Sequence, residues 1–403
     1  MFTSKKIIAT GIVLLIAIGA IAYGLWLFIF QTTTTPVASF TYFPTNPVIY
    51  GTVIFDASAC YDPDGHIANY TWNFGDGNVT VTDDSMVEHR YASIGDYTVT
   101  LNVTDNSNMQ SSTAITLYSA AMVVVDDLGR EVVIDKPPKR IVSMAPSVTE
   151  ILFAVGVGDK VVGVTDACDY PPEASGIEKI RESYGDFNVE KIVELEPDLV
   201  VMDRYLDLYP PGFWLSKLEE IELKVVVLYA KNFEDVFHDI KLVGNATITQ
   251  ENATNLVTSL EQRVKTVTNK VKNLTEEEMP RLFATGYYDG ESDPWTSGYG
   301  TFGDAIIKKA GGINIAGIKG GYFQMDLEAI IWANPEIVIV IEDYTWPTPT
   351  YDALLSDYRL STIDAIKNGA VYKIDANLMS RPGPRLVDGL EETAEILHPE
   401  RFP

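Results

Sequence analysis

The 403-residue chain has few of the residues on which covalent catalysis and metal binding usually depend. Its only cysteines, Cys60 and Cys168, fall in segments that we expect to fold separately, which argues against a disulfide. No CxxC motif supports a zinc knuckle or a redox site. No two of the four histidines are spaced as a ligand pair, which argues against capture of a bare metal ion. GxSxG, HExxH and P-loop motifs are absent, so we predict no enzyme, no catalytic residue and no cofactor.

Basic residues are also scarce. The chain has 30 Lys and Arg against 56 Asp and Glu, which gives a formal net charge of −26. No cluster of Lys or Arg offsets this charge locally. Such a chain should be soluble and should repel nucleic acid and anionic lipid headgroups. We therefore expect no nucleic-acid partner.

One long apolar run, from Ile7 to Phe30, lies near the amino terminus. It is long enough to span about 30 Å of hydrocarbon as a helix. Lys5 and Lys6 precede it and no basic residue follows closely, which places the amino terminus in the cytoplasm. We predict that residues 1–30 form a cytoplasmic stub and an uncleaved signal anchor, with a cleaved signal peptide as the alternative. The protein would then be a single-pass membrane protein with the bulk of its chain outside the cell.

Six Asn-X-Ser/Thr triplets agree with an extracellular location, because they are acceptors for N-glycosylation. Such triplets also arise by chance, so their support is modest. The candidate asparagines are Asn69, Asn78, Asn102, Asn245, Asn252 and Asn273.

Residues 31–36 form a Thr-rich linker, after which residues 36–119 change to alternating polar and apolar residues. The short segments "VASFTYFP", "GTVIFDAS", "NYTWNFG" and "GDYTVTLNVTD" predict an antiparallel, immunoglobulin-like β-sandwich. The words "DASACYDPDGHIANYTWNFGDG" and "HRYASIGDYTVTLNVTD" resemble the polycystic-kidney-disease (PKD) domain, which implies a spacer or adhesion module. Asp62, Asp64 and Asp76 could hold calcium, although turn formation explains acids at such positions better.

From residue 122 to 403, strands alternate with helical stretches, which predicts an α/β fold with mostly parallel sheets. "VVVDDLGREVVID" is a hairpin-like lead-in. A first Rossmann-like lobe should cover about 138–245 and a second about 280–403. Between them, apolar residues recur at alternating steps of three and four, so one long amphipathic helix over about 250–277 should bridge the lobes.

One phrase occurs in both lobes. "VEKIVELEPDLVVMD" begins at Val189 and "LEAIIWANPEIVIVIED" begins at Leu327. In each phrase a Glu, Glu190 or Glu328, is followed seven residues later by a Pro, then an acid, then aliphatic residues. The Pro ends a helix and the aliphatic run enters a sheet, so the phrase marks equivalent corners of two similar lobes. The matched glutamates would suit a two-lobed partner.

Residues from about Val123 to Pro403 resemble the class III periplasmic binding proteins of ABC importers for vitamin B12, ferric siderophores and haem. "DDLGREVVIDKPPKRIVSMAPSVTEILFAVGVGDKVVGVTDACDYPPEA", "FNVEKIVELEPDLVV", "GTFGDAIIKKAGGINIAG" and "MDLEAIIWANPEIVIV" carry the resemblance in order. It implies two lobes joined by one helix, with ligand held between them. It also implies that Glu190 and Glu328 dock onto arginines of a permease dimer, which works with a cytoplasmic ATPase.

The ligand of an open α/β sheet sits beyond the carboxyl ends of its strands, so residues at the predicted strand ends, and in the Gly-rich loop "GESDPWTSGYG", should line the cleft. Ser147 precedes a helical stretch with Glu150 three residues on, so we also expect it to cap that helix. The cleft candidates are Met144, Ser147, Asp169, Tyr170, Arg204, Tyr205, Tyr229, Tyr287, Tyr288, Trp295, Tyr299, Tyr344, Trp346 and Arg381.

The aromatic bias of this set suits a large flat macrocycle. Only Arg204 and Arg381 could pair with an anionic iron chelate, and "VVGVTDACDYPPEA" resembles the vitamin B12 branch more closely. We therefore predict capture of a corrinoid, with a ferric siderophore or haem as the alternative. A surface adhesin or sensor that uses its PKD-like module is a second alternative.

Overall fold

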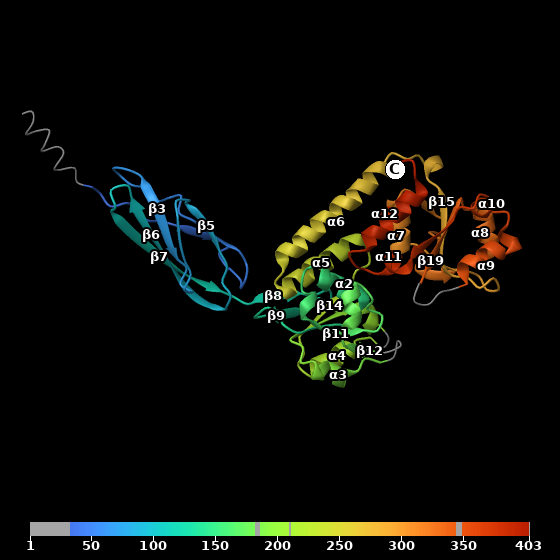
Figure 1. Cartoon of the computed structure of the whole chain (residues 1–403), viewed down its shortest axis with the longest axis horizontal. Helices are drawn as coiled ribbons and strands as arrows, with labels where there is room; N and C mark the ends of the chain where they lie inside the picture. Colours follow the sequence, from blue (N-terminus) through green and yellow to red (C-terminus); the bar gives the residue numbers. More distant parts are fainter. Residues whose placement is uncertain (1–32, 182–185, 209–210, 344–348, 403) are drawn as a thin grey trace, which may run out of the picture. The chain divides into compact units, whose positions relative to one another are not determined.

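The computed structural model describes residues 33–181, 186–208, 211–343 and 349–402, shown in colour in Figure 1. The predicted anchor within residues 1–30 lies outside these ranges. Among the described residues, no helix is both long enough and apolar enough to cross a membrane. The chain divides into two compact units between Met122 and Val123.

The first unit consists of two antiparallel sheets around one core. Their strand orders are β1-β2-β5 and β4-β3-β6-β7. Phe55 from one sheet and Trp72 and Leu101 from the other are fully buried in the same core. The strands are β1 (Thr41–Phe43), β2 (Val53–Asp56), β3 (Ile67–Asn73), β4 (Val79–Thr82), β5 (Met86–His89), β6 (Gly95–Asp105) and β7 (Gln110–Ser119).

Two of the acids considered for calcium accept hydrogen bonds within this unit. Asp76 accepts hydrogen bonds from the backbone and side chain of Asn78 and contacts His89. Asp64 instead accepts from the backbone of Thr34. No group of three or more His, Cys, Asp or Glu side chains in the described ranges is placed to hold a metal ion.

The second unit opens with the hairpin β8 (Met122–Val125) and β9 (Glu131–Ile134), followed by the first lobe. That lobe has a parallel sheet of order β12-β11-β10-β13-β14, in which the strand order reverses between β10 and β13. The strands are β10 (Ile141–Ser143), β11 (Val161–Thr165), β12 (Lys179–Arg181), β13 (Leu199–Asp203) and β14 (Val225–Leu228). The helices are α2 (Pro146–Ala154), α3 (Val189–Glu194), α4 (Phe213–Glu220) and α5 (Phe233–Thr247).

The second lobe has a mixed sheet of order β18-β16-β15-β19-β20, with β17 also paired to β15. Helices α8, α9 and α10 pack on one face. The strands are β15 (Arg281–Tyr287), β16 (Trp295–Ser297), β17 (Ile313–Asn314), β18 (Tyr322–Gln324), β19 (Ile337–Glu342) and β20 (Val371–Asp375). The helices are α7 (Phe302–Lys309), α8 (Leu327–Ala333), α9 (Thr350–Ser356), α10 (Asp364–Lys367), α11 (Ala376–Ser380) and α12 (Leu386–Leu397). The predicted pair of α/β lobes is confirmed.

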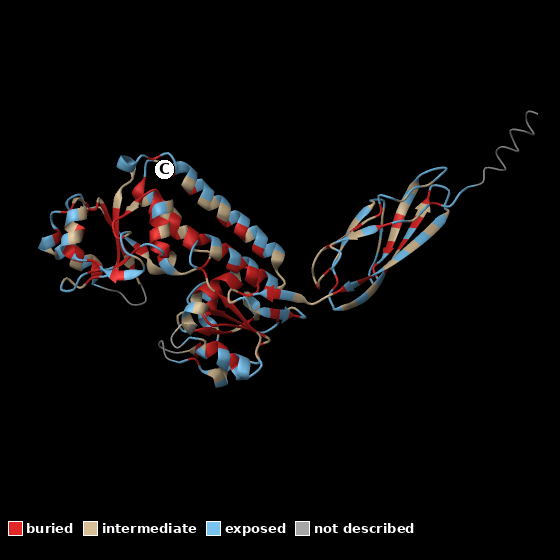
Figure 2. Ribbon diagram, turned by 180° about the vertical axis from the view of Figure 1, so that it is seen from behind, coloured by how far each residue is buried: buried red, intermediate tan, exposed pale blue. Residues whose placement is uncertain are grey.

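One long helix, α6 (Gln250–Val271), joins the lobes as predicted, with an exposed outer face (Figure 2). Asn252 donates to the carbonyl oxygen of Val155 in the first lobe. Arg263 pairs with two acids of α12 in the second lobe. The helix ends earlier than the predicted residue 277, because Thr275 forms a capping box with Glu278 that begins a separate turn.

The duplicated phrase builds the same corner twice. Asp198 accepts hydrogen bonds from the backbone nitrogens of Lys139 and Arg140, and the Arg140 side chain donates to the carbonyl of Leu195. Glu336 accepts from the backbone nitrogen of Arg281 in the same way. The Arg281 side chain, like that of Arg140, donates to a carbonyl at the end of the preceding helix. The acid after each Pro therefore fixes the start of the neighbouring strand.

The two corners should differ in strength. Asp198 bonds two backbone nitrogens, whereas Glu336 bonds one and adds an exposed ion pair. We expect Asp198→Ala to lower the free energy of unfolding by about 2–3 kcal/mol and Glu336→Ala by about 1 kcal/mol. Urea denaturation of the full chain measures both. Equal losses would contradict this account.

Candidate functional site

A cavity of about 380 Å³ lies between the lobes, at the carboxyl ends of the strands of both sheets. In the first lobe this is where the strand order reverses, the usual ligand position in open α/β sheets. An adjoining cavity of about 260 Å³ extends into the second lobe and shares Asp343, Ala376 and Ser380. We call the two together the cleft. The larger part is lined by Met144, Pro146, Thr165, Asp166, Ala167, Asp169, Arg181, Leu206, Asp343, Ala376, Asn377, Ser380 and Arg381.

Four of the predicted residues line the cleft. Met144, Asp169 and Arg381 line the larger cavity, and Trp295 lines the smaller one. Trp295 stands on β16 with its side chain about half exposed, so a ring face is available to a flat ligand.

Three further predicted residues lie close behind this lining. Ser147 donates a hydrogen bond to Asp203. The rings of Tyr205 and Tyr229 pack edge to face with centroids 5.3 Å apart, and Tyr205 is half exposed. Burial, together with nearby charges that include Tyr322 of the second lobe, raises the pKa of Tyr205.

Ser147 does not cap its helix, contrary to the prediction. The helix α2 begins at Pro146 with Ala145 as its N-cap, and no side chain caps it. Proline is favoured at the first helical position because it lacks the amide hydrogen that would stay unpaired there. This start places Ser147 inside the helix, where it is buried. Glu150 therefore does not take part in a capping box with Ser147.

Other predicted residues lie elsewhere. Tyr288 is wrong as a cleft residue, because it is buried in the core of the second lobe with its hydroxyl between Asp357 and Arg359. Tyr170 lines a separate groove beside α2. The described linings of the two cleft cavities do not include Arg204, Tyr287 or Tyr299. Tyr344 and Trp346 lie outside the described residues.

The sequence analysis missed several cleft residues. Asp343 follows β19 and could have been found by the strand-end rule. Asn377 stands on the five-residue helix α11, which is too short to show a helical period. Tyr322 is the first residue of β18, so a rule that selects the carboxyl ends of strands does not find it.

Two arginines of the second lobe donate hydrogen bonds to one buried carboxylate of the first lobe. The Glu150 side chain on α2 is only 1% exposed and accepts hydrogen bonds from Nη1 of Arg381 at 3.3 Å and Nη2 of Arg385 at 2.5 Å. Arg381 also donates to Asp169 at 2.6 Å and to the carbonyl of Ala167 at 3.2 Å. The Arg385 guanidinium stacks over the Tyr170 ring at 3.9 Å. We call these contacts the interlobe clamp.

A group of buried acids lies behind the first-lobe side of the cleft. Burial raises the pKa of Asp203 to about 6. Burial and a hydrogen bond with Asp127 raise the pKa of Asp239 to about 10. Asp127 also pairs with His238 and accepts a hydrogen bond from the backbone nitrogen of Tyr229. Asp239 is therefore protonated at neutral pH and can share its proton with Asp127.

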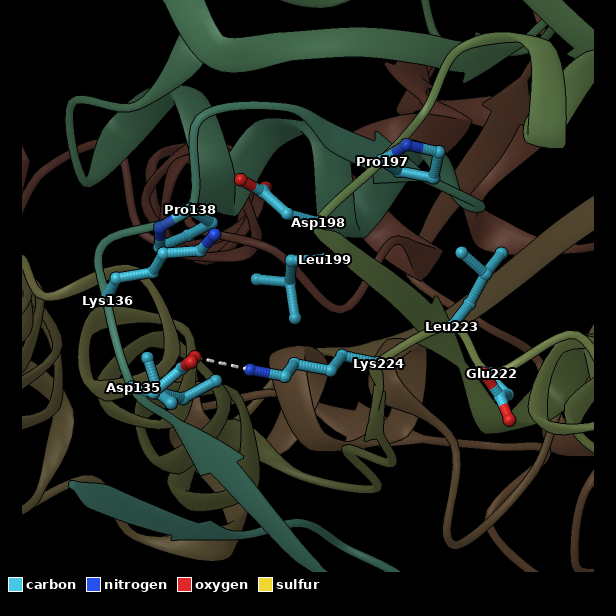
Figure 3. Close-up of a pocket in the computed structure, with 10 residues that line it drawn as sticks. Asp135, Lys136, Pro138, Pro197, Asp198, Leu199, Glu222, Leu223 and Lys224 are labelled. Atoms are coloured by element: carbon cyan, nitrogen blue, oxygen red, sulfur yellow. Dashed lines mark hydrogen bonds and ion pairs between the residues drawn. The ribbon is translucent and has the colours of Figure 1, made fainter.

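A third cavity, of about 240 Å³, lies at the opposite edge of the first-lobe sheet (Figure 3). Its walls precede β13 and β14, and an ion pair of 2.6 Å between Lys224 and Asp135 crosses it. Amino ends of parallel strands are not where such folds bind ligands, and Asp198 here is already bound to backbone nitrogens. The cleft between the lobes is the better candidate.

Comparisons with known proteins agree with this geometry. A family model described as "Periplasmic binding protein" matches residues 141–378, and one described as "PKD domain" matches residues 33–120. YvrC of Bacillus subtilis, an uncharacterized ABC transporter substrate-binding lipoprotein, is 33% identical over 282 residues, which is 70% of this chain and 87% of that protein.

Two further proteins are similar over the same unit. A vitamin B12-binding protein of Vibrio cholerae is 26% identical over 265 residues, 65% of this chain and 90% of that protein. The crystal structure of a possible iron-binding (periplasmic solute-binding) protein from Staphylococcus epidermidis has a TM-score of 0.56 and 26% identity, and the match covers 65% of this chain and 100% of that one.

Two variants together test the interlobe clamp, because Arg381 contacts one buried carboxylate, Glu150, and one exposed carboxylate, Asp169. Asp169 is 43% exposed, so its pair with Arg381 is screened by solvent. We expect Glu150→Ala to lower the free energy of unfolding by about 3 kcal/mol, because it leaves Arg385 without its buried partner. Asp169→Asn should lower it by less than about 1 kcal/mol. Chemical denaturation measures both, and similar losses would argue against the clamp.

The buried acid gives a pH-dependent prediction. Because the pKa of Asp239 is raised to about 10 in the folded state, the fold holds a proton that the unfolded chain loses near pH 4. Stability should therefore fall as pH rises between these values. Asp239→Asn removes this titration and should gain at least about 1.4 kcal/mol relative to the wild type between pH 5 and pH 9. Glu234→Gln, exposed on the same helix, is the control; a parallel pH profile for Asp239→Asn would refute the assignment.

Proposed function

The chain belongs to the periplasmic binding protein family, and from that premise we propose that it is the membrane-anchored, extracellular substrate-binding protein of an ABC importer. It binds a small molecule without converting it, and delivers it to a permease dimer driven by a cytoplasmic ATPase. The observation that carries this proposal is the cleft, lined by the strand ends of both lobes. A PKD domain precedes the binding unit and acts as a spacer.

A corrinoid is the proposed ligand because of the charges in the cleft. Arg381, which could have paired with an anion, is already held by Glu150 and Asp169. Asp166 and Asp343 add two negative charges to the lining, against one positive charge from Arg181. Anionic iron chelates are held through charge-assisted bonds from arginine, and this lining favours a neutral or cationic macrocycle instead.

The relatives support two ligand classes. The similarity to a vitamin B12-binding protein agrees with a corrinoid. The similarity to a possible iron-binding protein keeps a ferric siderophore or haem as the alternative. A surface adhesin or sensor would use the PKD module rather than the cleft as its binding site.

The apolar run from Ile7 to Phe30 would anchor the protein to the cell membrane. The relative YvrC is a lipoprotein, and lipoproteins are held at the membrane by acyl chains. Neither cysteine of this chain lies near the run, so a transmembrane helix would take the role of the lipid.

Glu190 and Glu328 are proposed to dock onto the permease. Each is the second residue of its helix, directly after a capped start at Asn188 or Asp326, and each is exposed. The helix α3 follows β12 of the parallel sheet, and α8 follows β18, which runs in the same direction as β15 because both pair antiparallel to β16. Both helices therefore start at the carboxyl edge of their sheet, on which the cleft opens. One acid from each lobe would then meet one arginine from each permease subunit.

Calorimetry on the full chain tests the ligand. We expect cyanocobalamin or cobinamide to bind at one site per chain without turnover, and haem and ferric hydroxamates to bind weakly. The expectation rests on the acids of the lining and on the pairing of Arg381 with Glu150 and Asp169. Binding of an iron chelate alone would overturn the corrinoid while leaving the importer role intact.

Deletion of residues 36–118 is the control for the PKD module. Ligand affinity should stay unchanged, because all described residues of the cleft lie in the second unit. A large loss of affinity in the shortened protein would favour the adhesin or sensor alternative.

A further inference from the structure

The most exposed tryptophan in the described ranges stands beside a proposed docking glutamate. Trp332 on α8 is 89% exposed. It follows Glu328 by four residues, which places both side chains on the same face of the helix. The opposite face of α8 is occupied, since Leu327 and Ile330 are buried in the core of the second lobe. Folding of the lobe therefore does not require the Trp332 ring.

The first lobe has a different residue at the equivalent position. Aligning the duplicated phrases places Glu194 of α3 opposite Trp332, just as Glu190 stands opposite Glu328. Glu194 is also exposed, at 71%, and pairs with Lys191. Each lobe thus presents a glutamate at the same position, Glu190 or Glu328. Four residues later, the first lobe presents an acid and the second lobe an indole.

We propose that Glu328 and Trp332 together hold one arginine of the permease, the carboxylate by an ion pair and the indole by stacking on the guanidinium plane. This rests on the importer function proposed above and adds a second contact to that site. A guanidinium suits such a pair, because its edge donates hydrogen bonds while its face packs on aromatic rings. Tryptophan is the ring that binds cations best, and it is enriched among residues that dominate binding interfaces.

The occupant follows from charge and shape. The chain carries a net charge of −26, and α8 presents an acid next to the ring, so a cationic partner is favoured over a second copy of this acidic chain. Because only the second lobe has the indole, the docking would also have an orientation. The second lobe would be held more tightly than the first against two equivalent permease subunits.

The test uses the full chain and the permease–ATPase complex of its proposed importer, reconstituted in nanodiscs, with the dissociation constant measured by biolayer interferometry. We expect Trp332→Ala to weaken docking about tenfold and Trp332→Phe, which keeps a ring face, to weaken it less than Trp332→Leu. Tyr358→Ala is the matched control, since Tyr358 is an 83% exposed aromatic of the same lobe. Ligand affinity and unfolding should be unchanged in all variants.

A double-mutant cycle tests whether both side chains hold the same group. Residues that share one partner are non-additive, so Glu328→Ala with Trp332→Ala should lose less than the product of the single losses. Normal docking by Trp332→Ala, with weakened docking by Glu190→Ala and Glu328→Ala, overturns the tryptophan contact and leaves the importer role standing. Additive losses overturn the shared arginine. Failure of the wild-type chain to dock at all overturns the proposed function itself.

Discussion

The arrangement of the cleft depends on one buried carboxylate. Glu150 lies on the first helix of the first lobe, and Arg381 and Arg385 reach it from the second lobe. A charge buried to this degree is tolerated only when it is paired, so the contact fixes the position of α2 relative to the second lobe. The same arginine, Arg381, reaches the cleft wall through Asp169. Arg381 therefore contributes both to the relative position of the two lobes and to the charge of the cleft surface.

The clamp and the bridging helix act together. The helix α6 is fastened to the first lobe through Asn252 and to the second through Arg263, so it holds the two lobes at one end while the clamp holds them near the cleft. Two separate attachments leave less freedom for a hinge than a single connection does. Selection of a ligand would then depend on the residues that already line the cleft, more than on closure around it.

Sequence reasoning found what local patterns determine. The duplicated phrase predicted two equivalent corners, and the strand-end rule found Met144, Asp169 and Arg381. It failed at Tyr288, because neighbouring residues at the end of a strand point to opposite sides and the sequence does not tell which side is the core. The clamp was out of reach for another reason. Its partners are 231 and 235 residues apart, and no local spacing joins Glu150 to the arginines.

The duplication itself separates architecture from function. The acids that follow Pro197 and Pro335 accept hydrogen bonds from backbone nitrogens in both lobes. Their recurrence is therefore explained by the fold, without a binding partner. Among the described residues, neither Glu190 nor Glu328 makes a comparable side-chain contact, although both come just after the helix cap. Because these two glutamates recur without a structural reason, a partner with two equivalent subunits can explain why they recur. The difference at Glu194 and Trp332 then marks where that partner would distinguish one lobe from the other.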